Sequence, residues 1–329
     1  MIRPAPPPSR SPEHAARVET ILAQGHRGEA SDREAIRGAL DELFANARQF
    51  NSSTAYLELM QFIGRFHFYS PFNAMLIHIQ MPGARFVATA RRWGRDFHRQ
   101  IKVGAQPVVI LQPMGPVLFV FDVTGTEPLP GAPPLPGWVE RPFEVRNGTI
   151  GTELVWAVEN AKRDGVRVSE RPHGSQRAGS IQRAATTEYL DVLTAGTPVP
   201  TRLNVPLRYE LLLNSNLSRG ARYATLVHEL GHLYCGHQGT PDQKWWPDRR
   251  GLPLAVREFE AESICYLVCA RLGIDNPSDQ YLAAYVRRCN ATPPISLDCV
   301  MRSSWLIEQM GRKRLPMRKG TVHQPISEL

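Results

Sequence analysis

The sequence lacks the features of membrane-spanning and secreted proteins. No apolar run approaches the roughly 18 residues of a membrane span. The first residues, Met-Ile-Arg-Pro-Ala-Pro-Pro-Pro, hold no apolar signal-peptide core. The 5 cysteines are scattered and form no C-x-x-C pair, and neither an internal repeat nor a glycine-rich phosphate loop occurs. These absences predict a cytoplasmic protein that keeps its thiols reduced and does not bind membranes.

The chain is long enough for two domains. It has 329 residues, of which 42% are hydrophobic, so it can build cores of ordinary size. The formal net charge of +8 permits an anionic partner, but many proteins this basic bind no nucleic acid. The distribution of the charge therefore matters more than its sum.

One stretch carries a recognisable chemical pattern. His228-Glu229-Leu230-Gly231-His232 is an H-E-x-x-H motif within a segment whose apolar residues recur at helical spacing. His228 and His232 stand four residues apart, so both imidazoles lie on one helix face and can bind one zinc ion per chain. Glu229 can then take a proton from a metal-bound water. Histidines that only pack or cap a helix are the alternative.

An acidic segment downstream offers the third ligand that a catalytic zinc site needs. In residues 257–266, Glu258 and Glu262 are four residues apart and share a helix face, whereas Glu260 points elsewhere. One carboxylate can bind the ion while the other hydrogen-bonds a ligand histidine and fixes its ring. We expect Glu258 to be the ligand and Glu262 to be the supporting carboxylate. A solvated acidic face is the alternative.

His237 suggests a different ligand set. In the metzincin pattern H-E-x-x-H-x-x-G-x-x-H, the third histidine follows the second by six residues. His237 follows His232 by five, and Cys235 stands where that pattern has its glycine. The spacing argues against a metzincin site, and His237 is expected in a loop beyond the helix end. Cys265 and Cys269 are expected to be buried thiols, and a second zinc site built from cysteines stays open.

The order of these segments resembles a known family. Residues 209–217, 221–232 and 258–262 are similar to the ImmA/IrrE-type zinc metallopeptidases, and equally to the catalytic half of the ArdC-type antirestriction proteins. The resemblance covers roughly residues 150–290. It implies an α+β fold with a zincin-like (gluzincin) metallopeptidase domain, in which a small sheet accompanies the active-site helices, preceded by a smaller α+β domain.

The resemblance also implies roles for individual residues. In that family two histidines and a downstream glutamate bind zinc and the motif glutamate is the base, which maps onto His228, His232, Glu258 and Glu229. The implied function is a zinc-dependent metalloendopeptidase acting on a protein or peptide, with a transcriptional regulator as the family-level candidate. The alternative is an ArdC-like single-stranded-DNA-binding antirestriction protein of a mobile element, whose zinc domain is mainly a scaffold. A scaffold has no use for the base, so Glu229 favours catalysis.

Composition and hydrophobic periodicity predict the layout of the chain. Residues 128–143 are rich in proline and are typical of a semi-rigid linker. The predicted regions are a mobile Pro/Arg-rich tail (1–31), an N-terminal α+β domain (32–127), this linker, the metallopeptidase domain (144–310) and a solvated basic tail (311–329). Helices are expected over 32–50, from Ser52 or Ser53, from Pro71, and over 154–161, 279–289 and 297–310. A hairpin is expected at 108–121, a strand at 166–169, a loop or hairpin tip at 171–182, and at 209–213 an edge strand able to bind an extended peptide.

A basic stretch interleaved with aromatic residues lies in the N-terminal domain, at 85–102. Arg91, Arg92 and Arg95 are candidate phosphate contacts, and Trp93 could stack on a base of single-stranded DNA. The order of elements around it resembles, more loosely, the domain of ArdC-type proteins that is associated with single-stranded DNA. The alternative is a basic amphipathic helix whose aromatic side chains pack inward.

Overall fold

The computed structural model describes most of the chain after residue 52. The described residues are 53–112, 115–140, 148–172, 178–193, 202–274, 278, 282–285, 292–318 and 324–325. The predicted tail at 1–31, the predicted helix at 32–50 and most of the predicted helix at 279–289 lie outside them. So do 141–143 of the linker and most of the basic tail beyond 318.

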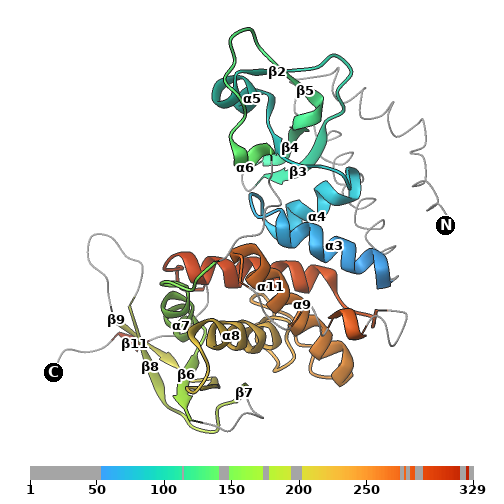
Figure 1. The fold of residues 1–329 in the computed structure, drawn as a ribbon. Coiled ribbons are helices and arrows are strands. Elements are labelled where there is room, and N and C mark those ends of the chain that lie inside the picture. The colour runs from blue at the N-terminus through green and yellow to red at the C-terminus, as the bar shows by residue number, and fades with distance from the viewer. Residues whose placement is uncertain are drawn as a thin grey trace.

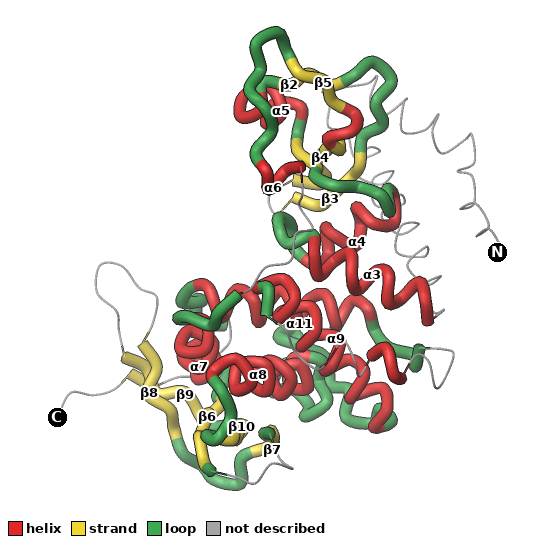
Figure 2. Tube along the Cα trace, viewed as in Figure 1, coloured by secondary structure: helices red, strands yellow, loops and turns green. Residues whose placement is uncertain are grey.

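The described elements are helices and short strands, as predicted for an α+β protein (Figures 1 and 2). The helices are α3 (Ser53–Arg65), α4 (Pro71–Gln80), α5 (Ala90–Phe97), η2 (Val123–Gly125), α6 (Gly137–Glu140), α7 (Glu153–Arg163), α8 (Arg219–Tyr234), α9 (Leu254–Leu272) and α11 (Leu297–Arg312). The strands are β1 (Val87–Ala88), β2 (Arg99–Ile101), β3 (Val108–Gln112), β4 (Gly115–Asp122), β5 (Thr126–Pro128), β6 (Val166–Arg171), β7 (Gly179–Arg183), β8 (Tyr189–Leu193), β9 (Arg202–Pro206), β10 (Tyr209–Asn214) and β11 (Gln324–Pro325). No helix among the described residues is long and apolar enough to cross a bilayer.

Helix α4 lies along the edge of β3 and takes the place of a neighbouring strand. The side-chain amide of Asn73 donates to the carbonyl of Leu111 and accepts from its N–H. Gln80 does the same with Val109. On its other side β3 pairs with β4, which confirms the predicted hairpin. The predicted helices starting near Ser53 and at Pro71 are confirmed as α3 and α4.

The N-terminal helices share a hydrophobic core with the helices that follow. Tyr56 and Ile63 of α3 belong to the same buried cluster as Leu226 of α8. Figure 1 shows α3 beside α9, and α4 contacts α11. The buried Arg271 of α9 donates to the carbonyls of Ile63 and Phe66, at 3.1 Å each. The domain boundaries stay a prediction. Among the described residues, side chains before and after the proline-rich segment belong to one hydrophobic core.

Three strands form the small sheet beside α8, in the order β6-β10-β7. Strand β10 runs parallel to β6 and antiparallel to β7. The predicted strand at 209–213 is therefore confirmed, but its predicted place at the sheet edge is wrong, because it pairs on both sides. The expected loop at 171–182 is also wrong in part, because Gly179–Arg183 forms β7. This strand reads Gly-Ser-Ile-Gln-Arg, and its one strongly apolar residue gives no alternation to recognise.

The segment after α11 folds back onto the helices, so the predicted solvated tail is wrong for its first residues. Arg318 donates to both oxygens of the buried Asp164, at 2.7 and 3.0 Å, and its guanidinium lies 5.2 Å from the ring centre of Trp246. The hydroxyl of Tyr234 donates to the same carboxylate at 2.9 Å. Arg318 therefore joins the C-terminal segment to the end of α8 and to the turn between α7 and β6.

Candidate metal centre

Helix α8 carries the H-E-x-x-H motif against α9. Ser218 caps its first turn by accepting a hydrogen bond from the backbone N–H of Ala221. At Gly231 a Cβ atom would lie 3.4 Å from the Cα of Ala261, an ordinary packing distance, so this side of α8 packs directly against α9. The predicted helices through the motif and through the glutamate segment are confirmed.

The structure brings the two motif histidines and Glu258 together. The Nε2 atoms of His228 and His232 are 3.2 Å apart, and oxygens of Glu258 lie 3.6 Å from the first and 3.5 Å from the second. A tetrahedral zinc site with bonds of about 2.0–2.1 Å needs ligand atoms about 3.3 Å apart. The three side chains also form one of the groups in the described residues whose donor atoms could hold a metal ion. Their spacing therefore fits zinc.

Three carboxylates raise the pKa of His228. Oε1 of Glu262 lies 3.5 Å from its Nδ1. Burial lowers the pKa of His228, but Glu258, Glu262 and Glu229 outweigh burial and raise this pKa to about 9. In return, hydrogen bonds from His228 and His232 hold the pKa of Glu258 well below its usual range. A proton and a metal ion therefore compete for the same ring.

Glu229 lies between α8 and the edge strand β7. Burial raises the pKa of Glu229 against the opposing effect of the two motif histidines, and its carboxylate accepts a hydrogen bond from the backbone N–H of Ile181. At Gly179 a Cβ atom would lie 2.5 Å from the side chain of Thr225 and 3.6 Å from Oε1 of Glu229. Because of the clash with Thr225, only a residue without a side chain lets β7 pass this close to α8, one turn before the motif glutamate.

A buried group behind His232 was not predicted from the sequence. His237 does follow the helix end, as expected, but it is buried, with Nδ1 3.0 Å from Nδ1 of His232. Its Nε2 lies 2.9 Å from Glu260, which points away from the other two glutamates as predicted but is fully buried. Arg249 donates to both oxygens of Glu260, at 2.7 Å each. The only sequence signal is Gly236, a residue able to turn the chain back under the helix.

Cysteines contribute to one further group of potential ligands. Donor atoms of Cys235, His237 and Glu260 lie within 4.8 Å of one another. The oxygens of Glu260 already accept hydrogen bonds from Arg249 and from the backbone N–H of Ser296. Its charge is therefore balanced without an ion. Cys265 and Cys269 are buried thiols, which confirms their prediction.

The candidate nucleic-acid contacts on α5 differ in their exposure to solvent. Trp93 is fully buried and its Nε1 donates to the carbonyl of Phe121 at 2.8 Å. An indole in that position cannot stack on a base, which overturns the predicted role of Trp93. Arg91 and Arg95 are exposed and Arg92 is half-buried. The aromatic side chains thus pack inward, which is the alternative that the sequence left open.

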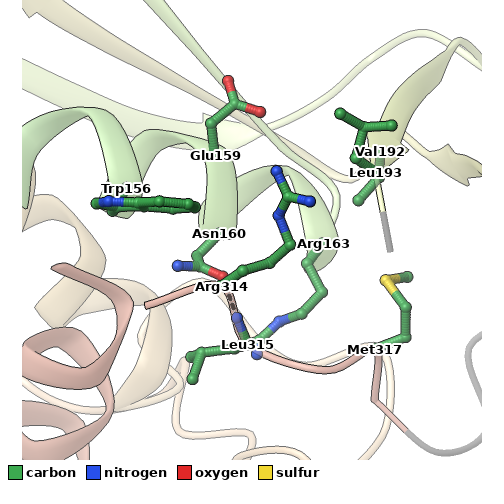
Figure 3. A pocket seen from close by; sticks show the side chains of 9 residues that line it. All are labelled: Trp156, Glu159, Asn160, Arg163, Val192, Leu193, Arg314, Leu315 and Met317. Atoms are coloured by element: carbon green, nitrogen blue, oxygen red, sulfur yellow. Dashed lines mark hydrogen bonds between the residues drawn. The ribbon is translucent and has the colours of Figure 1, made fainter. Parts of the chain in front are cut away.

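A small pocket lies away from this centre. Figure 3 shows it between α7, β8 and residues 314–317, with Trp156, Arg163 and Arg314 among the lining side chains. The guanidinium of Arg314 lies 5.7 Å from the ring centre of Trp156. None of the predicted site residues lines this pocket, so it bears on neither the metal nor the base.

Comparison with known families identifies one domain. Residues 162–262 match the family model of the IrrE N-terminal-like domain, Peptidase_M78. The chain therefore contains a domain of the ImmA/IrrE type, and the matched segment includes both motif histidines, Glu229, Glu258 and Glu262. The match supports metallopeptidase activity, whereas the ArdC-like layout stays a prediction. No curated protein and no solved structure matched the chain.

Proposed function

We propose that this protein is a zinc-dependent metalloendopeptidase in which His228, His232 and Glu258 hold one zinc ion. The observation that carries the proposal is the spacing of the three donor groups, 3.2 to 3.6 Å, which matches a tetrahedral ion. When bound, zinc polarises the scissile carbonyl and lowers the pKa of water toward ~7. Glu262 orients the ring of His228 from its other nitrogen.

Glu229 is the proposed base. It adjoins the first ligand along α8, and the hydrogen bond from Ile181 to its carboxylate restrains its position. Burial raises its pKa, which suits a group that must accept a proton and then return it to the leaving amine near neutral pH.

Strand β7 is the proposed place for the substrate backbone. Among the described strands it pairs only with β10, so its other edge is available for main-chain hydrogen bonds, except at the N–H of Ile181, which donates to Glu229. Gly179 at its start lies beside Glu229. An extended peptide added to this edge would run past the base. A transcriptional regulator is the family-level candidate for the protein substrate.

The second candidate function is that of an ArdC-like, single-stranded-DNA-binding antirestriction protein. The exposed guanidinium groups of Arg91 and Arg95 on α5 are the observation that favours it. Because Trp93 is buried, it cannot stack on a DNA base, so only the positive charge of α5 supports this second function.

Glu229→Gln in the full-length protein tests the proposal. We expect the wild type to hold about one zinc per chain and to cleave unstructured peptides. The variant should hold the same zinc but lose activity by about 10²–10⁴-fold, because the amide cannot accept the proton. Activity that survives the substitution would exclude Glu229 as the base. A zinc-loaded wild type that cleaves nothing would favour the scaffold reading.

A further inference from the structure

Behind His232, four side chains form a buried row: His232, His237, Glu260 and Arg249. Nδ1 of His232 lies 3.0 Å from Nδ1 of His237, and Nε2 of His237 lies 2.9 Å from Oε2 of Glu260. Arg249 donates to both oxygens of Glu260, at 2.7 Å each. The side chains of His237 and Glu260 are 0% exposed and that of Arg249 is 18% exposed. Water therefore does not compete for the hydrogen bonds in the middle of the row.

The chemistry of these groups fits one arrangement of protons. Nε2 of His232 faces His228 and Glu258, so its lone pair is the one available to a metal and the proton belongs on Nδ1. His237 then accepts at Nδ1 and donates from Nε2, and the ionised carboxylate of Glu260 is an acceptor only. Arg249, which is always charged, holds that carboxylate through two parallel hydrogen bonds. The N–H of each histidine in the row then meets an acceptor.

We infer that His237 is a positioning residue for His232. It fixes the tautomer and the ring orientation that point Nε2 toward the ion, and Glu260 with Arg249 fixes His237 in turn. His237 touches neither substrate nor metal, so it acts through the ligand. The inference rests on the proposed zinc site and adds a support for its second histidine.

The backbone around the row restrains it further. Gly236, with φ of +80°, turns the chain so that the N–H of His237 donates to the carbonyl of His232 at 2.9 Å. The backbone N–H of Arg249 donates to the carbonyl of Gly236 at 2.9 Å. The carboxylate in the row also accepts from the N–H of Ser296, directly before α11, at 2.7 Å. The orientation of His232 is therefore coupled to α8, to the loop before α9 and to the start of α11.

The test compares zinc affinities of full-length variants by competition with a chromophoric chelator. His237→Phe keeps a planar ring but removes both hydrogen bonds, whereas His237→Asn keeps an acceptor near the position of Nδ1. We expect His237→Phe to bind zinc about 10–100-fold more weakly than the wild type, and His237→Asn to recover part of the loss. The visible absorption bands of the Co²⁺-substituted protein should shift in His237→Phe and shift less in His237→Asn, because the angles at the ligand change.

Melting curves of the zinc-loaded and metal-free proteins separate positioning from packing. If His237 positions His232, the rise in melting temperature on adding zinc shrinks in His237→Phe. If His237 only fills space in the core, the substitution lowers the melting temperature of the zinc-loaded and metal-free proteins by the same amount and leaves zinc affinity unchanged. That result would overturn the inference. Should His237→Phe fail to fold, Arg249→Lys takes its place, because lysine cannot make the two parallel hydrogen bonds. Unchanged zinc affinity in Arg249→Lys would overturn the inference equally.

Zinc stoichiometry distinguishes the remaining outcomes. A wild type with two zinc ions, one of which is lost in His237→Phe, would make Cys235, His237 and Glu260 a metal site and overturn the positioning role. A wild type that binds no zinc would remove the proposed function and the inference with it. One zinc bound with equal affinity by the wild type and His237→Phe would remove the inference alone.

Discussion

The Nδ1 atom of His228 lies 3.5 Å from Oε1 of Glu262, while the Nε2 atom of the same ring lies 3.6 Å from Oε2 of Glu258. The two carboxylates stand one turn apart on α9, yet they meet different nitrogens of one imidazole. Glu258 also approaches Nε2 of His232. This geometry supports the proposal that Glu258 is a metal ligand and that Glu262 supports the ring of His228.

Glu258→Ala should weaken zinc binding more than Glu262→Ala does. Losing a carboxylate that only orients a ligand typically costs ~10–100-fold in affinity, and losing a ligand should exceed that. Competition with a chelator measures both. Asp298→Ala, an exposed carboxylate at the start of α11, is the matched control and should leave the affinity unchanged. The opposite order for the two glutamates would exchange their roles.

Zinc affinity should rise with pH. Burial lowers the pKa of His228, but its three carboxylate neighbours raise it to about 9 in the absence of metal. Zinc must displace that proton, so apparent affinity should increase about tenfold per pH unit below this pKa and level off above it. Chelator competition from pH 6 to pH 10 measures the slope. An affinity that does not change over this range would contradict the raised pKa.

The same residue should make the metal-free protein more stable at low pH than at high pH. The pKa of His228 is higher in the folded protein, at about 9, than its unfolded value of about 6.5. Its contribution is therefore fully present below pH 6.5 and is lost as pH rises through 9. In urea unfolding, the stability advantage of the metal-free wild type over His228→Gln from this residue should be constant below pH 6.5, shrink between pH 6.5 and 9, and level off above pH 9.

Gly236→Ala should destabilise the protein and weaken zinc binding together. The backbone at Gly236 has φ of +80°, and a Cβ atom there would lie 1.9 Å from the carbonyl oxygen of Pro247. Left-handed strain and overpacking together should cost about 2–5 kcal/mol in urea unfolding. Zinc affinity should fall because this turn presents His237 to His232. Gly220→Ala, with nothing within 4 Å, is the control and should be neutral or slightly stabilising.

Trp93→Ala should unfold the small aromatic cluster around α5 rather than act on DNA alone. The indole is fully buried against Phe86 and Phe97, so its removal should cost about 3–5 kcal/mol. Arg91→Ala and Arg95→Ala are exposed changes and should stay within about 0.5 kcal/mol of the wild type. Thermal melting measures all three.

Salt titrations of DNA binding complete that comparison. If the α5 surface binds single-stranded DNA, each arginine variant should reduce the log–log salt slope by about 0.7. A Trp93→Ala protein that melts like the wild type but loses DNA affinity would restore the stacking role. If DNA affinity changes neither with salt concentration nor in the two arginine variants, the basic face of α5 is a solvated surface and not a DNA contact.

The sequence by itself determined the local part of the site. Histidines at i and i+4 share a helix face whatever the rest of the chain does, and the same geometry pairs Glu258 with Glu262. Periodicity likewise predicted α3, α4, α8, α9 and the hairpin of β3 and β4, because their apolar residues repeat with the period of the element. These inferences need only covalent spacing and backbone geometry.

The tertiary structure decided what depends on residues far apart in the chain. Strand β10 is central because β6 and β7 both pair with it, and no property of its own six residues specifies that. Trp93 is buried because distant segments cover it, although three arginines stand within two residues of it in the sequence. The row behind His232 joins a turn, a loop and the far face of α9. Hydrogen bonds and burial of this kind arise only when separate segments pack together, since each side chain alone would be satisfied equally well by water.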